Sequence, residues 1–129
     1  MRIIIAGCGR IGSELAMRLC HAEHSIVVID PDRESFDRLD ASFRGRTING
    51  LGFDRTTLQR AGIEATDAFA AVTSDDCSNA IIARIARLRF HVPRVVARLY
   101  DTRHATLYEI LGIQTASTVS WGVDRLEQL

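Results

Sequence analysis

The chain has 129 residues, of which 47% are hydrophobic, so it can bury the core of one domain. Its 16 basic and 16 acidic side chains cancel to a formal charge of zero, and no basic run suggests a nucleic-acid partner. No apolar segment approaches the ~18 residues of a membrane span, and the apolar run at the N-terminus is too short for a signal peptide. We therefore expect a cytoplasmic protein without direct membrane insertion.

All 16 basic side chains are arginines, because the chain contains no lysine. Lysine-dependent chemistry is thereby excluded for this chain, including Schiff-base catalysis, a P-loop and the Tyr-x-x-x-Lys pair of short-chain dehydrogenases. The three cysteines lack metal-ligand spacing and are odd in number, so we expect reduced thiols and no metal site. These cysteines are Cys8, Cys20 and Cys77.

Strand and helix patterns alternate along the whole chain. In chain order we expect a strand over 2–6, a helix over 10–21, a strand over 25–29, a helix over 32–43, a strand over 47–49, a helix over 56–61, a strand over 68–72, a helix over 78–90, a strand over 95–97, a helix over 102–111, a strand over 116–119 and a last helix from about Gly122. This alternation predicts an α/β fold: a Rossmann-like, doubly wound, parallel six-stranded sheet of order 3-2-1-4-5-6 with helices on both faces. Residues 1–129 would form a single domain.

The most informative segment is at the N-terminus, where a buried-strand pattern leads directly into Gly-x-Gly-x-x-Gly. A second apolar run then ends in Asp30, and this order is typical of dinucleotide-binding domains. Gly7 allows the tight turn, Gly9 lets the backbone approach a pyrophosphate, and Gly12 lets the helix pack close to the sheet. Phosphates would meet free N–H groups at the positive end of the helix dipole.

Asp30 is expected to accept a hydrogen bond from a ribose 2′-hydroxyl. It also precedes Pro31, and an Asp before Pro is a favourable helix start, so capping is the alternative role and one carboxylate could serve both. A ribose contact predicts that NAD(H) binds better than NADP(H), because a 2′-phosphate would face a carboxylate.

Further polar residues follow the other strands, at the edge where such sheets bind ligands. Arg10 stands at a helix N-terminus, where a cation is unfavourable unless a phosphate binds there, so we favour phosphate contact over a solvated side chain. Thr73 and Ser74 either contact the nucleotide or cap the next helix. Arg98 could reach a phosphate across the crevice or form a salt bridge with Asp101.

Two small residues have a structural alternative to ligand contact. Gly50 is more typical of a turn, although a glycine there would let an adenine lie flat on the backbone. Cys8 lies inside the glycine loop at a helix N-terminus, where its pKa could fall. A small side chain that fills this loop is the favoured interpretation.

With these motifs in place, the chain resembles the RCK/KTN domains, also called TrkA N-terminal domains, of potassium channels and transporters. Residues 7–12 read Gly-Cys-Gly-Arg-Ile-Gly and residues 28–32 read Val-Ile-Asp-Pro-Asp, which match the first family blocks. Later blocks also match: Leu-Gln-Arg-Ala-Gly-Ile at 58–63, Val-Thr-Ser-Asp-Asp at 72–76 and Val-Val-Ala-Arg at 95–98. The resemblance covers essentially the whole chain, and the Ala-Gly-Ile and Val-Thr-Ser-Asp-Asp blocks are more specific than the glycine motif.

The resemblance implies a regulatory nucleotide sensor and not an enzyme. Such domains bind NAD(H) or the adenine nucleotides ATP, ADP and AMP, form homo-oligomers (dimers, in some cases rings) and act on a membrane potassium channel or transporter subunit from its cytoplasmic side. By matching positions, the cofactor-binding residues would be Gly7, Cys8, Gly9, Arg10, Ile11, Gly12, Asp30, Gly50, Leu51, Thr73, Ser74 and Arg98.

Two departures from the family pattern affect this expectation. Leu51 stands where many members have Asp, so a carboxylate contact to adenine or to a cation is lost. The family's crossover helix and C-terminal ligand-binding lobe do not follow Leu129, so this chain resembles the N-terminal lobe of a longer polypeptide, with a free-standing lobe as the alternative. Two other functions remain open: the cofactor-binding half of an NAD-dependent oxidoreductase, and an oligomerisation module that holds its nucleotide constitutively.

Overall fold

Residues 1–129 of the computed structural model contain one parallel sheet, in the order β3-β2-β1-β4-β5-β6. This order and the parallel pairing confirm the predicted doubly wound topology. The strands are β1 (Arg2–Ala6), β2 (Ser25–Asp30), β3 (Arg46–Asn49), β4 (Ala68–Ala71), β5 (Arg94–Leu99) and β6 (Gln114–Ser117).

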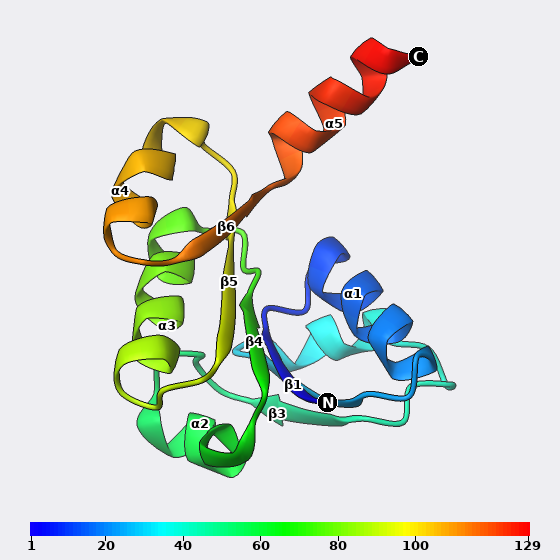
Figure 1. The fold of residues 1–129 in the computed structure, drawn as a ribbon. Helices are drawn as coiled ribbons and strands as arrows, with labels where there is room; N and C mark the ends of the chain where they lie inside the picture. The colour runs from blue at the N-terminus through cyan, green and yellow to red at the C-terminus, as the bar shows by residue number, and fades with distance from the viewer.

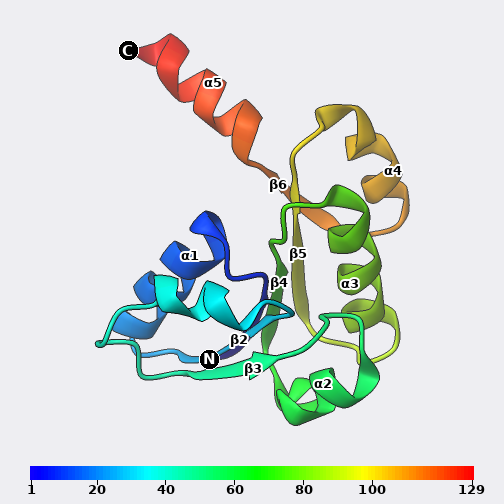
Figure 2. The ribbon, with the colours of Figure 1, turned by 180° about the vertical axis from the view of Figure 1, so that it is seen from behind.

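Helices cover both faces of the sheet (Figures 1 and 2). The α-helices are α1 (Arg10–His21), α2 (Arg55–Arg60), α3 (Asp76–Leu88), α4 (Ala105–Ile110) and α5 (Thr118–Gln128), and the 3-10 helices are η1 (Arg33–Arg38), η2 (Ile63–Ala65) and η3 (Thr102–His104). No helix combines the length and the apolar character needed to cross a bilayer.

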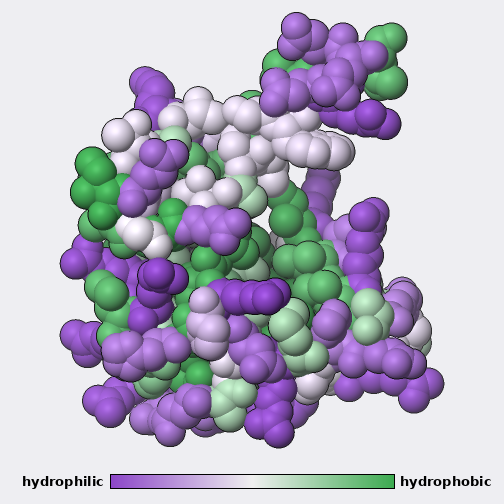
Figure 3. All heavy atoms as spheres, in the orientation of Figure 1, coloured by the Kyte–Doolittle hydropathy of each residue, from purple (hydrophilic) through white to green (hydrophobic).

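Two hydrophobic cores lie on opposite faces of the sheet, because successive strand residues point to opposite sides. Ile3 and Ile5 of β1 belong to the smaller core, which packs against α1 and η1. Ile4 and Ala6 belong to the larger core, under α2, α3 and α4. Figure 3 shows hydrophilic side chains over the periphery of one face and apolar side chains toward its middle. The central strands are thus buried on both sides, as expected for a parallel sheet.

The helix predicted over residues 32–43 is wrong beyond its first half. Only η1 forms, with Asp32 as its N-cap, and Leu39 is already extended at ψ 131°. The Asp40 side chain then accepts a 2.7 Å hydrogen bond from the backbone N–H of Ser42. Such Asp and Ser contacts satisfy the backbone locally and compete with helix propagation. Phe36 and Leu39 still pack on the smaller core, so their inward-facing positions were predicted correctly although the continuous helix was not.

The C-terminal boundary also differs from the prediction. The strand expected over 116–119 is β6 at Gln114–Ser117, and α5 begins at Thr118, not near Gly122. Ser117 is the N-cap, whose hydroxyl accepts a 3.2 Å hydrogen bond from Ser120 N–H. α5 buries no residue and projects away from the sheet (Figure 1).

Candidate nucleotide-binding site

A cavity of about 550 Å³ opens at the carboxyl ends of the strands, between β1, β2, β4 and β5. This is the switch point of the strand order, where doubly wound sheets hold their ligands. Its lining residues are Gly7, Gly9, Arg10, Ile11, Asp30, Pro31, Ser35, Arg38, Leu51, Gly52, Phe53, Val72, Thr73, Ser74, Asp75, Ser78, Ile82 and Arg98.

The three glycines of the loop have different geometric roles. Gly7 adopts φ +112° and lies against the backbone of Val72 and Thr73, which leaves no room for a Cβ atom. A Cβ on Gly12 would stand 1.8 Å from the Gly7 carbonyl oxygen, so this glycine lets α1 approach the loop. A Cβ on Gly9 would meet nothing within 4 Å, so the backbone of Gly9 faces open space.

The start of α1 is open toward this space. Its N-cap is Gly9, and no side chain caps the helix there. The first N–H groups of a helix have no intrahelical partner and attract anions. Arg10 is exposed at the same end, and its side chain makes no hydrogen bond or ion pair with the rest of the chain.

Asp30 ties the loop after β1 to the segment after β2. Its Oδ2 accepts a 2.7 Å hydrogen bond from Cys8 N–H. Its Oδ1 accepts hydrogen bonds from Asp32 N–H at 2.8 Å and from the Ser35 hydroxyl at 3.2 Å. The N-cap of η1 is Asp32 and not Asp30, so the capping role considered for Asp30 is wrong in its simple form. Three donors leave part of the carboxylate's acceptor capacity free for a ribose hydroxyl.

Cys8 is fully buried under the glycine loop and does not line the cavity. Burial first, and then the Asp30 carboxylate, raise the pKa of its thiol to about 11, although the Arg38 guanidinium acts in the opposite direction. The thiol therefore stays neutral at physiological pH. This agrees with a small residue that fills the loop.

Asn79, fully buried near the start of α3, holds the ends of β4 and β5 together. Its Oδ1 accepts hydrogen bonds from Thr73 N–H at 2.8 Å and from the Thr73 hydroxyl at 2.6 Å. Its Nδ2 donates to the carbonyl oxygens of Thr73 at 3.0 Å and Arg98 at 3.1 Å. The helix itself is capped by Asp75, whose carboxylate accepts from Ser78 N–H at 3.0 Å, so neither Thr73 nor Ser74 is the N-cap.

Arg98 spans the cavity wall formed by β4 and β5. Its Nη1 donates to the Thr73 carbonyl at 3.2 Å, and its guanidinium lies 5.8 Å from the centre of the Tyr100 ring. The salt bridge considered with Asp101 does not form, because Asp101 pairs with Arg103 at 2.7 Å. Arg98 thus lines the cavity without a carboxylate partner.

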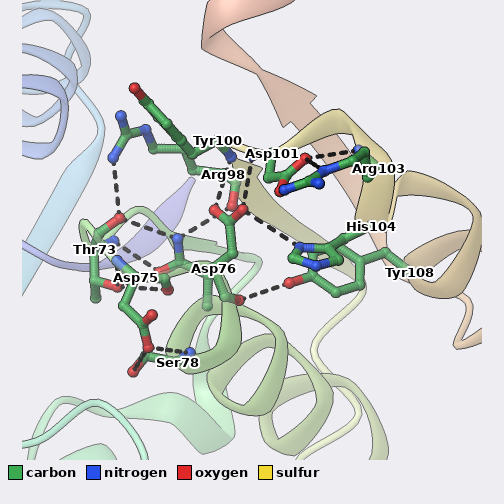
Figure 4. A network of polar contacts seen from close by, with 11 residues as sticks. Thr73, Asp75, Asp76, Ser78, Arg98, Tyr100, Asp101, Arg103, His104 and Tyr108 are labelled. Atoms are coloured by element: carbon green, nitrogen blue, oxygen red, sulfur yellow. Dashed lines mark hydrogen bonds and ion pairs between the residues drawn. The ribbon is translucent and has the colours of Figure 1, made fainter.

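Asp76, the first residue of α3, organises the loop after β5 (Figure 4). Its carboxylate accepts hydrogen bonds from Tyr100 N–H at 2.7 Å and Asp101 N–H at 2.8 Å. Its backbone carbonyl accepts from the Tyr108 hydroxyl at 2.8 Å, and His104 Nδ1 lies 3.8 Å from its Oδ2. Burial, and next the Asp76 charge, raise the pKa of Tyr108. This network fixes α4 and η3 beside the cavity without lining it.

The structure brings nine of the twelve predicted site residues together around the cavity: Gly7, Gly9, Arg10, Ile11, Asp30, Leu51, Thr73, Ser74 and Arg98. Cys8, Gly12 and Gly50 do not line it, so their prediction as ligand contacts is not supported by the geometry. Gly50 instead packs on Thr57 and donates its N–H to the Asp30 carbonyl, which makes it a turn residue.

Sequence reasoning missed Ser35 and Arg38, which line the cavity from η1. No motif marks them, and the helix expected over 32–43 gave no reason to select this part of its surface. It also missed the part played by Asn79, which lies three residues after the Val-Thr-Ser-Asp-Asp block. A polar residue among the apolar positions of a helix was the available signal.

Comparison with known proteins places this architecture in a family. The model of the TrkA-N domain matches residues 3–119. The Trk system potassium uptake protein TrkA of Streptomyces coelicolor is 53% identical over 126 residues, which are 98% of this chain and 56% of that protein. The chain thus spans about half the length of this relative.

Three solved structures share the fold. The TrkA-N domain of the inner membrane protein ybaL from Escherichia coli superposes with a TM-score of 0.85 at 22% identity, over 99% of this chain and 96% of that one. The Kef C-terminal domain of Shewanella denitrificans in its AMP-bound form superposes with a TM-score of 0.79 at 22% identity, over 99% of this chain and 81% of that one. The GsuK channel bound to NAD superposes with a TM-score of 0.75 at 22% identity, over 89% of this chain and 21% of that one. With the family match over nearly its whole length, the chain belongs to the TrkA-N domain family.

Proposed function

We propose that this chain is a nucleotide-binding regulatory domain of a potassium uptake system. NAD(H) or an adenine nucleotide occupies the cavity at the carboxyl edge of the sheet, and the occupied and empty states act differently on a membrane partner. The domain works on the cytoplasmic side of the membrane as a homo-oligomer, through a potassium channel or transporter subunit.

The observation that carries this proposal is the pairing of an open glycine turn with unpaired arginines. Gly9 leaves space at the uncapped N-terminus of α1, where a pyrophosphate fits the free N–H groups. Arg10, Arg38 and Arg98 line the same cavity, and none is in an ion pair. Asp30 stands at the end of β2 with acceptor capacity left for a ribose hydroxyl. The residues present thus fit an adenine nucleotide with its phosphates.

The relatives support the regulatory and potassium part of the proposal. The Streptomyces relative is named as a potassium uptake protein, and the structural neighbours include proteins solved with AMP and with NAD. Because the chain covers about half of that relative, the activity of the whole protein is carried over here only as a proposal.

We propose regulation and not catalysis because of the residue types around the cavity. No histidine, cysteine or tyrosine lines it, and the chain has no lysine. Hydride transfer to a carbonyl needs a proton donor within hydrogen-bond reach of the substrate. His104, the histidine nearest this edge, faces Asp76 and does not line the cavity. Sustained NADH oxidation with small carbonyl substrates would contradict the regulatory assignment.

A thermal-shift and calorimetry panel with NAD, NADH, AMP, ADP and ATP tests nucleotide binding directly. A ligand at 100 times its Kd adds about 2.7 kcal/mol, which raises Tm by several degrees in a domain of this size. A saturable shift with at least one of these ligands is expected. Absence of binding by all five, in protein shown to be free of co-purified nucleotide, would overturn the proposal.

The regulatory role requires a measurement on the full-length protein in cells. Asp30→Ala in the full-length protein is expected to change potassium uptake without lowering the amount of protein at the membrane. Uptake identical to that of the parent, with nucleotide binding abolished in vitro, would separate binding from regulation and contradict the sensor role. Ligand that survives extensive dialysis and never exchanges would favour a constitutively loaded module.

A further inference from the structure

Arg38 lines the nucleotide cavity from a side that the glycine motif does not identify. It ends η1, the helix that follows β2, and Asp30 and Ser35 line the same cavity. In a doubly wound sheet, the end of the second strand holds the ribose that carries the adenine. Arg10 instead begins α1, and Arg98 lies near the end of β5. Arg38 is therefore the arginine on the ribose wall.

The carboxylate on this wall is largely engaged by the protein itself. Asp30 accepts hydrogen bonds from Cys8 N–H, Asp32 N–H and the Ser35 hydroxyl at 2.7, 2.8 and 3.2 Å. These donors lie on both sides of the carboxylate and offset part of its negative charge. A phosphate near Asp30 is therefore opposed less strongly than it would be by a free carboxylate.

Arg38 has no partner within the chain. The ion pairs of the structure are Arg18–Glu14, Arg103–Asp101 and His104–Asp76. The positive charge of Arg38 lies close enough to the glycine loop to oppose the rise in the pKa of Cys8 that burial and Asp30 cause. A guanidinium group matches the geometry of phosphate oxygens and binds them through paired N–H donors.

We propose that Arg38 is a ligand for a phosphate on the ribose 2′ position, so that the site accepts NADP(H) as well as NAD(H). This inference rests on the proposed function, because it concerns the same cavity. It revises the expectation that Asp30 alone selects NAD(H). Asp30 holds the 2′-hydroxyl of NADH, and Arg38 neutralises the 2′-phosphate of NADPH.

The test compares the Kd values of NADH and NADPH for the parent, Arg38→Gln and a matched control, Arg33→Gln. Arg33 begins the same 3-10 helix but lines a different hollow, beside Asn49 and Arg60. We expect the parent to bind NADPH within about tenfold of NADH, which is about 1.4 kcal/mol. Arg38→Gln should weaken NADPH about tenfold further and leave NADH within about twofold, and Arg33→Gln should change neither.

A further variant and a further ligand pair separate the effect of the Arg38 charge from that of its paired N–H donors, and locate the phosphate that Arg38 contacts. Arg38→Lys keeps the charge but loses the paired donors, and should restore part of the NADPH affinity lost in Arg38→Gln. Adenosine 2′,5′-bisphosphate should lose affinity in Arg38→Gln while 5′-AMP does not. Thermal unfolding of each variant checks folding. Because Arg38 is exposed and has no partner within the chain, its substitution should leave Tm unchanged.

Several outcomes would overturn the inference. Equal losses of NADH and NADPH in Arg38→Gln would mean that Arg38 contacts adenine or pyrophosphate. An unchanged ratio, or a parent that binds NADH but rejects NADPH by more than about a hundredfold, about 2.7 kcal/mol, would leave Asp30 as the sole determinant. If the parent bound neither dinucleotide nor any adenine nucleotide, the proposed function itself would fail together with this inference.

Discussion

Cys8 N–H and Asp30 Oδ2 are joined by a hydrogen bond of 2.7 Å, which links the loop after β1 to the end of β2. The two parts of the dinucleotide fingerprint are thus in contact through the protein itself. Because the contact is made by a backbone N–H, its geometry depends on the glycine turn and not on the identity of side chain 8. The carboxylate is consequently held in place before any ribose meets it.

The first prediction contrasts two glycines of the same loop. Gly12→Ala should destabilise the domain by about 3 kcal/mol or more, because its Cβ would stand 1.8 Å from the Gly7 carbonyl oxygen. Gly9→Ala should leave Tm unchanged, because its Cβ meets nothing within 4 Å. The methyl group would nevertheless occupy the approach of a phosphate and weaken nucleotide binding about tenfold. Thermal unfolding and calorimetry measure the two effects, and a Gly9→Ala protein with full affinity would contradict the assigned phosphate position.

A second prediction concerns Asn79. Asn79→Ala removes four hydrogen bonds of a fully buried side chain, among them the acceptor of the part-buried Thr73 N–H, which should cost about 2–4 kcal/mol. Asn49→Ala is the control, since exposed Asn49 also donates two hydrogen bonds, to the carbonyls of Asp30 and Pro31. Chemical denaturation should show a much smaller loss for the control. Equal losses of unfolding free energy in the two variants would show that burial does not strengthen the contribution of the Asn79 hydrogen bonds to stability.

Substitution of Arg10 should change the stability of the domain and its affinity for ATP in opposite directions. Arg10→Ala removes a cation from a helix N-terminus and should stabilise the free domain by about 0.3–1 kcal/mol. The same variant should lose affinity for ATP but keep its affinity for adenosine, because only ATP carries phosphates. Arg18→Ala on α1, which removes an exposed pair with Glu14, is the control. ATP affinity equal to that of the parent would exclude Arg10 as a phosphate ligand.

The cysteines predict a pattern of thiol reactivity. Cys77 is exposed and should react rapidly with a thiol reagent at pH 8, whereas buried Cys8 should react only on unfolding. The Cys8 pKa is raised from 9.0 to about 11, mainly by burial, so the unfolded thiol ionises before the folded one. Stability should therefore fall as pH rises from about 9 to about 11, and the fall should be smaller in Cys8→Ala. Mass spectrometry of the labelled protein and denaturation at several pH values check these expectations. Rapid labelling of Cys8 in the folded state would show that the glycine loop opens.

Much of the fold follows from local patterns in the sequence. Apolar runs that alternate with helical spacing, together with right-handed crossovers, suffice for the order β3-β2-β1-β4-β5-β6. The carboxyl ends of parallel strands meet at one edge, so Arg10, Asp30, Thr73 and Arg98 could be grouped from their sequence positions alone. The requirement for glycine at position 12 was also readable, because helix and loop must approach closely there.

Other features depended on side-chain contacts and local packing that hydrophobic periodicity does not encode. Apolar spacing over 32–43 could not reveal that Asp40 would bond the Ser42 backbone and stop the helix at Arg38. Arg38, the last residue of this short helix, lines the cavity. Likewise, whether Gly50 faced a ligand or Thr57 depended on how α2 packs. Sequence by itself determined the strand order and the edge that carries the site, because these follow from periodicity and chain connectivity. Only the tertiary structure decided which side chains share the cavity, because that depends on where each loop ends and what packs against it.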